Sequence, residues 1–567
     1  MPLLSIAARV AVVAGLLVYG ITETLGLFSL LRRETIATAW IVAALLLWRR
    51  VPRPAAWSPH GRWFEAACFA LVAGIAVVLL VTAIVSPPNS ADAMAYHMPR
   101  VVYWAQAGNV AFFPTTYFNQ VSLPPLAEYF MLHTYLLSGG DGFVNLVQWF
   151  GFLGSACGAA LVTRSLGADS RMQAFAALFA ATIPVVPLQA SGAKNELVLA
   201  TYLLLAAHFL LEGRLFWFAA ALGLAVATKS TAYLFAPPLL AVCVWTARRN
   251  PLRVAAAAIL GILALNMPLY VRNYRLSGSV LGFDSAQGDG KFRWRNDRFG
   301  WDVTVSNALR HFSEQMGGRS EDWNRFVYRR VLDAHAALGL DANDPATTWP
   351  DERFTPPRNA NHEANAPGRW PLAFLAAGVL VACVRRRWAF VWHAAAVLTG
   401  YLAYCAFLKW QPFMSRLESP LLLLGAPLAA LVFESVRFRP VQAALCVFLL
   451  SGARLPLLQN WTRPLTGERS LFATSREENY FRDMSQFGGG AEYFRAANLV
   501  ARAGCKRVGI DIRRNELEYP MMALLRARVP GVQFVHVPQA TGPAPCAVVC
   551  LGCGEEGAVA GRILVLI

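Results

Sequence analysis

The feature that most limits how this chain folds is a series of apolar runs, each about 20 residues long and separated by polar segments. A run of this length, such as Phe64–Val85, crosses the roughly 30 Å hydrocarbon core of a bilayer as a helix. Helices are expected at about residues 9–31, 35–48, 64–85, 142–162, 172–187, 195–211, 214–228, 231–247, 254–271, 370–384, 388–408, 417–434 and 440–458. The sequence therefore predicts an α-helical polytopic membrane protein with about 13 transmembrane helices.

Composition supports the same class. The chain is 56% hydrophobic and only 15% charged, which is too little charge to cover the surface of a soluble protein of 567 residues. The first run, Val10–Leu31, is too long for the apolar part of a cleaved signal peptide. We therefore expect it to be a retained helix.

Positive charge sets the expected orientation. The net charge of +17 does not predict a nucleic-acid partner, because arginines gather in short loops between apolar runs, as at Arg248, Arg249 and Arg385–Arg387. The positive-inside rule places these loops and the N-terminus in the cytoplasm. Segments 86–141 and 271–369, and everything after about 459, are then expected on the periplasmic side.

Two domains are expected, a transmembrane domain over 1–458 and a small periplasmic α/β domain over 459–567. The second shows alternating strand and helix patterns, beginning with the strand Arg507–Ile512. It also holds Cys505, Cys546, Cys550 and Cys553, which suit either a disulfide or a metal. An oxidising compartment favours the disulfide.

Ionisable side chains collect where the apolar runs meet the external face. The clearest case is Ser86–Arg100, in which Pro87 and Pro88 end a helix and Asp92 follows. The ionisable residues at the external ends are Asp92, His97, Lys194, Glu196, Lys229, Arg272, Arg275, His362, Glu363, Lys409 and Arg416. Charged groups at membrane depth are costly and mark functional sites. A cationic cleft with a few carboxylates suits an anionic lipid headgroup such as a phosphate.

Simpler interpretations of these residues stay open. Asp92 also suits a helix cap, and His97 suits a buried hydrogen bond. Glu196 also suits a plain ion pair with Lys194. Arg416, like Arg272, also suits an interfacial anchor.

Several motifs resemble those of a known family. They are DAMAYHMPRV around Asp92, SGAKNELVLA at 191–200, GLAVATKSTAYLFAPPLL at 223–240, PLYVRNYRLSG at 268–278 and KWQPFMSR at 409–416. Over about 86–435 the chain resembles the type-C glycosyltransferases of the bacterial inner membrane, which include protein O-mannosyltransferases and the lipid A aminoarabinose transferase. It departs from them at Ala93, where the family often has a second acid, and in having two spans before the reactive loop where many members have one.

The resemblance implies transfer of a sugar from a polyprenyl-phosphate donor to a lipid, glycan or protein acceptor, with inversion at the anomeric carbon. It implies Asp92 as the base. The donor phosphate would be bound by Lys194, Arg272, Lys409 and Arg416. The residues expected to orient the acceptor or a metal ion are Glu196, His97, Tyr96 and Glu363, and the metal itself stays unknown.

Two other functions remain open, a transporter or flippase of a lipid-linked sugar and a non-catalytic envelope assembly protein. The sequence shows no convincing internal repeat, and its polar residues lie at external helix ends rather than in broken helices at the membrane centre. Both features favour the enzyme.

Overall fold

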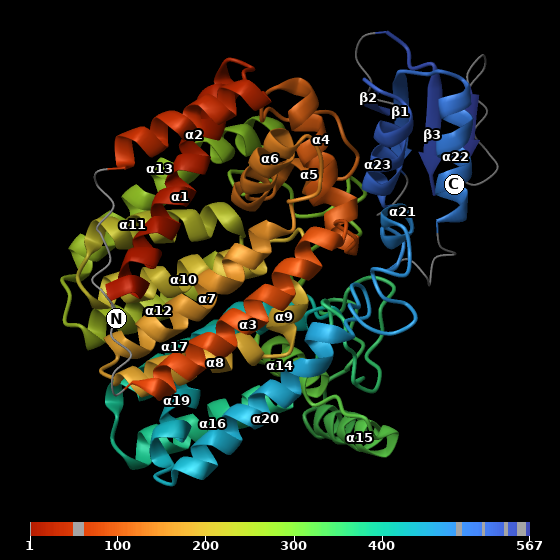
Figure 1. Ribbon diagram of the computed structural model, residues 1–567. Helices are drawn as coiled ribbons and strands as arrows, with labels where there is room; N and C mark the ends of the chain where they lie inside the picture. The colour runs from red at the N-terminus through yellow and green to blue at the C-terminus, as the bar shows by residue number, and fades with distance from the viewer. Residues whose placement is uncertain are drawn as a thin grey trace.

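Long helices packed side by side form most of the computed structural model, and a small sheet domain lies at one end (Figure 1). The structure describes residues 2–48, 62–483, 490–512, 516–537, 543–552 and 563–566. The helices of the main body are α1 (Pro2–Leu27), α2 (Arg33–Leu47), α3 (Trp63–Val85), α7 (Leu146–Ser165), α8 (Ser170–Thr182), α9 (Val185–Gln189), α10 (Glu196–Leu211), α11 (Leu215–Thr228), α12 (Ala232–Thr246), α13 (Pro251–Ser277), α16 (Arg369–Val384), α17 (Trp388–Phe407), α18 (Ser415–Leu424), α19 (Ala426–Ser435) and α20 (Arg439–Leu458). Each predicted apolar run is helical.

Six of these helices are long and apolar enough to cross a membrane alone, namely α1 from Leu3, α3, α7, α13, α17 and α20. The pair α18 and α19 passes the same test together and bends by 52° at Gly425. Four shorter apolar helices, α10, α11, α12 and α16, lie among them. The polytopic helical class is confirmed, whereas the number of about 13 spans stays a prediction.

Small residues let the central helices approach closely. A Cβ at Gly151 of α7 would lie 2.8 Å from the backbone of Leu197 in α10, and one at Gly154 would lie 2.5 Å from the Thr201 side chain. Membrane helices depend on such small residues because burial of apolar surface does not drive them together in lipid. This contact fixes the first turn of α10, which carries Glu196.

The first external segment holds η1 (Ala93–His97, a π-helix), α4 (Met98–Ala107), α5 (Asn119–Ser122) and α6 (Leu126–Ser138). The sequence predicts that the apolar flank near Met98 and Val101 lies on lipid at the membrane surface. Both side chains are instead fully buried, and the C-terminal domain covers α4. An apolar flank suits a protein interior as well as lipid, so the pattern does not distinguish them.

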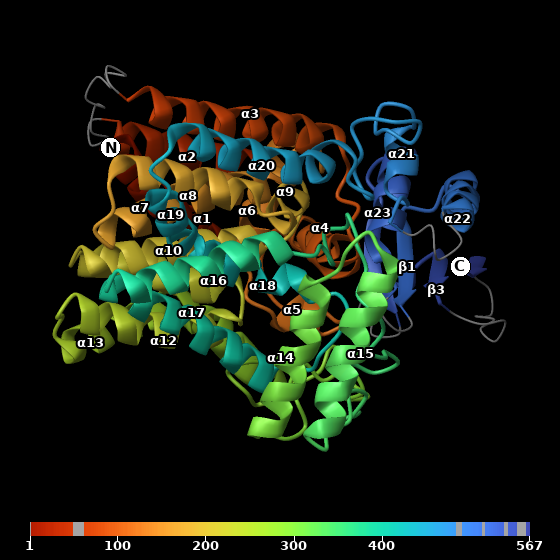
Figure 2. The same cartoon turned by 90° about the horizontal axis from the view of Figure 1, so that it is seen from below.

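The long external segment forms two helices, α14 (Trp301–Gln315) and α15 (Glu321–Ala337), which project away from the main body (Figure 2). The side chain of Asn307 in α14 donates to the carbonyl oxygens of Cys405 (2.7 Å) and Leu408 (3.0 Å) at the end of α17. These bonds satisfy carbonyls that the helix itself leaves free.

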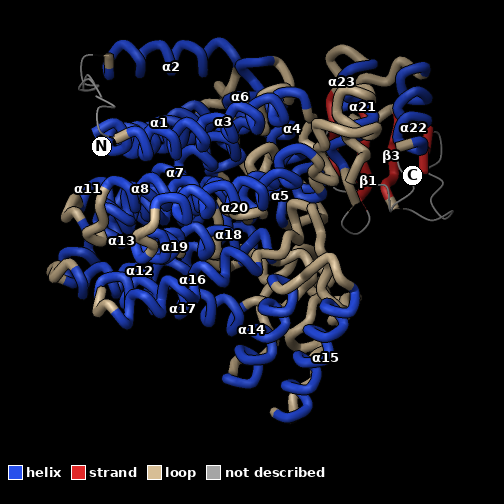
Figure 3. The backbone as a smooth tube through the Cα atoms, turned by 60° about the horizontal axis from the view of Figure 1, so that its bottom comes forward, coloured by secondary structure: helices blue, strands red, loops and turns tan. Residues whose placement is uncertain are grey.

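The C-terminal part is a parallel sheet with helices beside it (Figure 3). Its elements are α21 (Arg476–Asn479), α22 (Ala491–Arg502), β1 (Arg507–Ile512), α23 (Glu518–Arg528), β2 (Gln533–Val537), β3 (Ala547–Leu551) and β4 (Ile563–Leu566). The strand order is β2-β1-β3-β4. A disulfide joins Cys505 to Cys546, as the compartment argument favours, while Cys553 lies outside the described residues. The small α/β domain is confirmed, and its boundary at 459 stays a prediction.

A buried carboxyl joins this domain to the first external segment. Glu518 of α23 is fully buried and accepts hydrogen bonds from the Tyr103 hydroxyl (2.5 Å) and from Gln120 Nε2 (2.7 Å). Burial raises the pKa of Glu518 to about 7, although both hydrogen bonds act to lower it. The carboxyl therefore takes up a proton near neutral pH.

The raised pKa predicts that the docked domain loses stability as pH rises. An acid with a folded pKa near 7 stabilises the fold fully below its unfolded pKa of about 4.3, and this stability is lost as pH rises through about 7. The shift corresponds to at most roughly 3 kcal/mol. Glu518→Gln removes this dependence, so the difference between its thermal midpoint and that of the wild type should grow from pH 5 to pH 8. A difference that does not change with pH contradicts the prediction.

Candidate functional site

Asp92 lies in the turn between α3 and the π-helix η1. The chain leaves α3 at Ser86 in an extended conformation, and Pro87 and Pro88 keep it from continuing the helix. Asp92 has helical backbone angles and makes no side-chain cap hydrogen bond. Its carboxylate instead lies 2.7 Å from the Arg416 guanidinium and accepts a hydrogen bond from the Tyr96 hydroxyl (3.1 Å).

Two further carboxylates lie near this pair, each held by its own cation. Glu363 forms an ion pair with Lys194 at 2.8 Å. Glu196 accepts a hydrogen bond from Lys229 at 3.0 Å. The structure thus brings together five of the predicted site residues, namely Asp92, Tyr96, Lys194, Glu196 and Glu363, with Arg416 as a sixth.

Exposure divides this group into two layers. The side chains of Asp92 and Arg416 are 18% and 17% exposed, whereas those of Lys194 and Glu363 are 0% and 2% exposed. A bound molecule can therefore touch the Asp92–Arg416 pair directly. The Lys194–Glu363 pair lies behind it and acts through its charge and by fixing positions.

Arg463 is the residue of this region that the sequence analysis missed. It is fully buried and forms an ion pair with Glu363. It also donates to Asn89 Oδ1 (3.0 Å), Ser191 Oγ (3.1 Å) and the Leu188 carbonyl (2.9 Å). Four segments far apart in the chain meet at this guanidinium. The sequence offered one signal for this residue, its position as a cation shortly after the last apolar run.

The cations keep Asp92 ionised. Burial by itself would raise the pKa of the Asp92 carboxyl, but Arg416, then Lys194 and His97, lower it below its ordinary value. The pKa of the Tyr96 hydroxyl is raised well above its ordinary value by burial and by the charge of Asp92. Tyr96 therefore stays protonated and donates to a carboxylate that is free to accept a further proton.

His97 belongs to a separate buried group. Its Nδ1 lies 3.1 Å from Glu128, which also accepts from Arg100 at 3.2 Å. Arg100 donates further to the carbonyls of Val121 and Leu123. This group holds the π-helix and α4 against α5 and α6. The structure favours the simpler interpretation of His97, and its predicted role in orienting an acceptor or metal stays untested.

Arg272 and Lys409 are bound to partners outside this group. Arg272 makes two hydrogen bonds to Glu23 of α1, at 2.8 and 2.9 Å, and one to Tyr129. Lys409 donates to Asp297 at 3.0 Å. Their contact with a donor phosphate stays a prediction, and of the four predicted cations only Lys194 and Arg416 lie beside Asp92.

No group of three or more His, Cys, Asp or Glu side chains that could hold a metal ion occurs among the described residues. In the site itself, the carboxylates of Asp92, Glu196 and Glu363 are each already matched by a cation.

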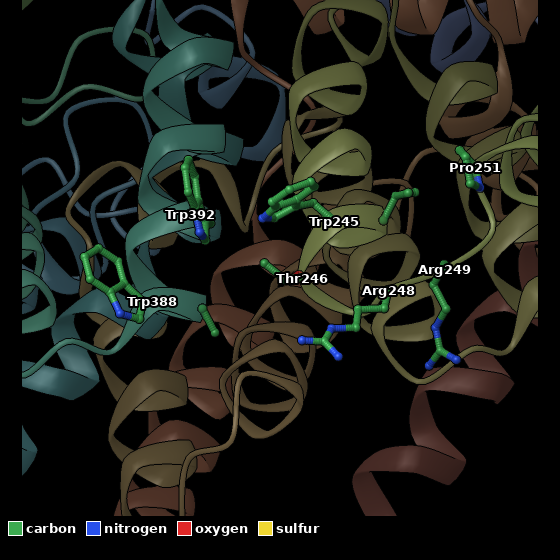
Figure 4. A pocket seen from close by; sticks show the side chains of 9 residues that line it. Trp245, Thr246, Arg248, Arg249, Pro251, Trp388 and Trp392 are labelled. Carbon is green, nitrogen blue, oxygen red and sulfur yellow. The ribbon is translucent and has the colours of Figure 1, made fainter.

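A cavity of about 680 Å³ lies at the C-terminal end of α12, away from the residues around Asp92 (Figure 4). Trp388 and Trp392 of α17 face Trp245 and Arg248 across it. Lys229, which binds Glu196, precedes α12, so the cavity lies about 25 Å from the site along the helix axis. No carboxylate lines it among the described residues, so it offers no base.

Comparison with known proteins identifies the fold. ArnT from Cupriavidus metallidurans in the apo state gives a TM-score of 0.50 at 15% identity, covering 88% of this chain and 87% of that one. ArnT bound to undecaprenyl phosphate gives 0.49 at 14% identity, covering 83% and 86%. No protein-family model and no curated protein matches the chain. ArnT is a lipid A aminoarabinose transferase, so the predicted resemblance to type-C glycosyltransferases is confirmed at the level of the fold.

The buried ion pairs predict a large effect of neutralising Glu363. Glu363→Gln leaves the buried cations Lys194 and Arg463 without their counter-charge, which should cost about 3 kcal/mol of stability. The thermal midpoint of the purified protein should fall by several degrees. The matched control is Asp322→Asn on α15, whose side chain is 90% exposed and whose ion pair with Arg325 contributes little. Equal midpoints for the two variants contradict the prediction.

Proposed function

We propose that this protein is a membrane glycosyltransferase that moves a sugar from a polyprenyl-phosphate donor to a lipid, glycan or protein acceptor on the periplasmic face. The observation that carries the proposal is the Asp92–Arg416 pair, a partly exposed carboxylate and guanidinium 2.7 Å apart with buried cations behind them. The fold it shares with ArnT supports the same class.

Asp92 would act as the general base. The acceptor hydroxyl or amine gives its proton to the carboxylate while its oxygen or nitrogen attacks the anomeric carbon. The bond from that carbon to the phosphate oxygen breaks on the opposite side, and its electron pair stays on the phosphate. A single displacement of this kind inverts the configuration. Tyr96 would keep Asp92 oriented through its hydrogen bond.

Arg416 would bind the phosphate as charge develops on it. Fixed cations aimed at a leaving group stabilise the transition state without reorganising. Lys194 would add positive charge to the phosphate site from behind Asp92. The charge of its ammonium already reaches this region, where it lowers the pKa of Asp92 and of Glu363. Glu363 would hold Lys194 in place, and Glu196 would hold Lys229.

An exchange of partners at Arg416 would activate the base. Arg416 is the strongest influence that lowers the pKa of Asp92. A donor phosphate that draws the guanidinium away leaves burial to raise that pKa, which makes the carboxylate a stronger base. The donor would thus prepare Asp92 for the acceptor.

The proposed location is the bacterial inner membrane, with the N-terminus in the cytoplasm. Helices α4 and α5, which follow Asp92 in the chain, lie beside the sheet domain at one end of the helical body (Figure 2). The arginine-rich loop at Arg248 and Arg249 follows α12, whose other end is preceded by Lys229, the partner of Glu196. The positive-inside rule supports placing that loop in the cytoplasm. Membrane lipids would surround the helices and supply the donor.

Loss of the base should abolish transfer. Asp92→Asn keeps the shape of the side chain but removes its capacity to accept a proton, so transfer should fall at least about 100-fold. The measurement follows radiolabelled sugar from a polyprenyl-phosphate donor to an acceptor in membranes, with the exposed Asp322→Asn as control. Full transfer by Asp92→Asn would falsify the proposal. Movement of intact donor lipid without transfer would indicate a flippase instead.

Arg416 should control both rate and pH dependence. Arg416→Ala removes the main influence that lowers the pKa of Asp92, so the acid limb of the kcat/KM profile should move to higher pH. The rate should also fall about 10²–10³-fold through lost stabilisation of the phosphate. Arg416→Lys keeps the charge and should restore part of both effects. An acid limb at the same pH in wild type and Arg416→Ala rules out the proposed coupling.

A further inference from the structure

The cavity at the C-terminal end of α12 has no part in the proposed transfer reaction, because it lies away from Asp92. Helices α12 and α17 pack against each other, and the cavity is lined by these two helices and by the loop that joins α12 to α13. Its volume of about 680 Å³ is typical of a small-molecule site, for which the range is roughly 300–1,000 Å³. The cavity is therefore large enough to hold a ligand of its own.

Three indole rings form the apolar part of its walls. Trp245 of α12 and Trp388 and Trp392 of α17 are 71%, 58% and 44% exposed. Trp245 and Trp392 lie on opposite sides of the gap (Figure 4). Tryptophan is enriched where helices meet the membrane surface, because its ring is largely apolar and its N–H is polar. These walls suit the glycerol region and the upper acyl chains of a lipid.

Arg248 is the cation of this cavity that is free to bind a ligand. Its side chain is exposed and points from the loop after α12 toward the α17 side of the gap (Figure 4). Within the part of the chain that the structure describes, this side chain makes no hydrogen bond or ion pair. The neighbouring Arg249 points away and donates to the carbonyl oxygen of Leu211 at 2.7 Å.

The backbone at the end of α12 fixes this division between the two arginines. Arg248 has a φ of 49°, in the left-handed region that few residues other than glycine adopt. Its N–H donates to the Trp245 carbonyl at 3.2 Å, and the N–H of Arg249 donates to the Val244 carbonyl at 3.0 Å. The turn is therefore bonded to the helix on both sides of the left-handed residue, and it directs Arg248 to the cavity and Arg249 to the end of α10.

The charges around the cavity favour an anion. In the loop before Trp388, Arg385 and Arg387 are both matched by Glu434, at 3.5 and 2.7 Å. The described lining residues include no carboxylate, so Arg248 has no counter-charge there. An anion would supply that charge, whereas the ammonium group of a zwitterionic headgroup would find no carboxylate to bind.

A soluble anion is a poorer match than a lipid. A free phosphate or a nucleotide would bind Arg248 but leave the indole walls open to water. A phospholipid places its phosphate on the guanidinium and its chains on the indole rings. Basic pockets between transmembrane helices on the cytoplasmic side bind anionic headgroups in other membrane proteins. The positive-inside rule supports placing the loop of Arg248 on that side.

We propose that this cavity binds one anionic phospholipid of the cytoplasmic leaflet, with its phosphate on the Arg248 guanidinium and its upper acyl chains between Trp245 and Trp392. A lipid held in this way contacts both α12 and α17, so its binding should stabilise the folded protein against heat.

The test titrates phosphatidylglycerol into the full-length, delipidated protein in a neutral detergent and counts bound lipid by native mass spectrometry. Wild type should bind one phosphatidylglycerol more tightly than any further one, and more tightly than phosphatidylethanolamine. Arg248→Asn should bind this lipid at least about tenfold more weakly, because a charge-assisted hydrogen bond is lost. Asparagine accepts the left-handed conformation, so the turn is kept. Arg248→Lys keeps the charge and should recover part of the affinity.

Two controls match the variants. Arg437→Asn removes an exposed cation from the loop between α19 and α20, which does not line the cavity. It should bind phosphatidylglycerol as wild type does. Trp392→Ala should weaken lipid binding, whereas Trp301→Ala, which removes an exposed indole from α14, should not. Thermal midpoints measured without lipid check that each variant is folded.

The outcomes decide both the site and its occupant. Equal binding of phosphatidylglycerol by wild type and Arg248→Asn overturns the proposal. An equal loss with Arg437→Asn also overturns it, because the affinity would then belong to the whole face. Inorganic phosphate that displaces the lipid at equal concentration would mean that the site takes the anion alone. Tighter binding of a polyprenyl phosphate would assign the cavity to a different lipid, and either result overturns the phospholipid.

Discussion

The end of the helical body that carries Asp92 depends on the burial of charge. Glu363 lies between Lys194 and Arg463, and all three side chains are almost fully hidden from solvent. A buried charge is tolerated only when it is paired and hydrogen-bonded, so none of the three positions can shift alone. Arg463 adds hydrogen bonds to Asn89 and Ser191. The loops that carry the site are therefore fixed to one another before any substrate arrives.

The Asp92–Arg416 pair lies next to this fixed group of buried charges. Glu196 and Glu363 each have their own cation, so neither competes for Arg416. Asp92 is left with a partly exposed guanidinium, the group that the proposed mechanism assigns to the donor phosphate. The same arrangement keeps Asp92 ionised, because the neighbouring cations lower its pKa.

The C-terminal domain contributes to the external face rather than standing apart from it. It covers α4, and Glu518 reaches Tyr103 and Gln120 at the interface. Covering α4 buries the apolar flank near Met98 and Val101 inside the protein.

The sequence by itself determined the helices and the small α/β domain, and it predicted Asp92 as a site residue. Hydropathy is a local property, and Pro87 and Pro88 end a helix wherever the chain goes. Only the tertiary structure decided which cation meets which carboxylate. It paired Arg416 with Asp92 and Arg272 with Glu23, and it turned His97 into the core through a π-helix. Pairing depends on distance in space between residues far apart in the chain, and no spacing in the sequence encodes that distance.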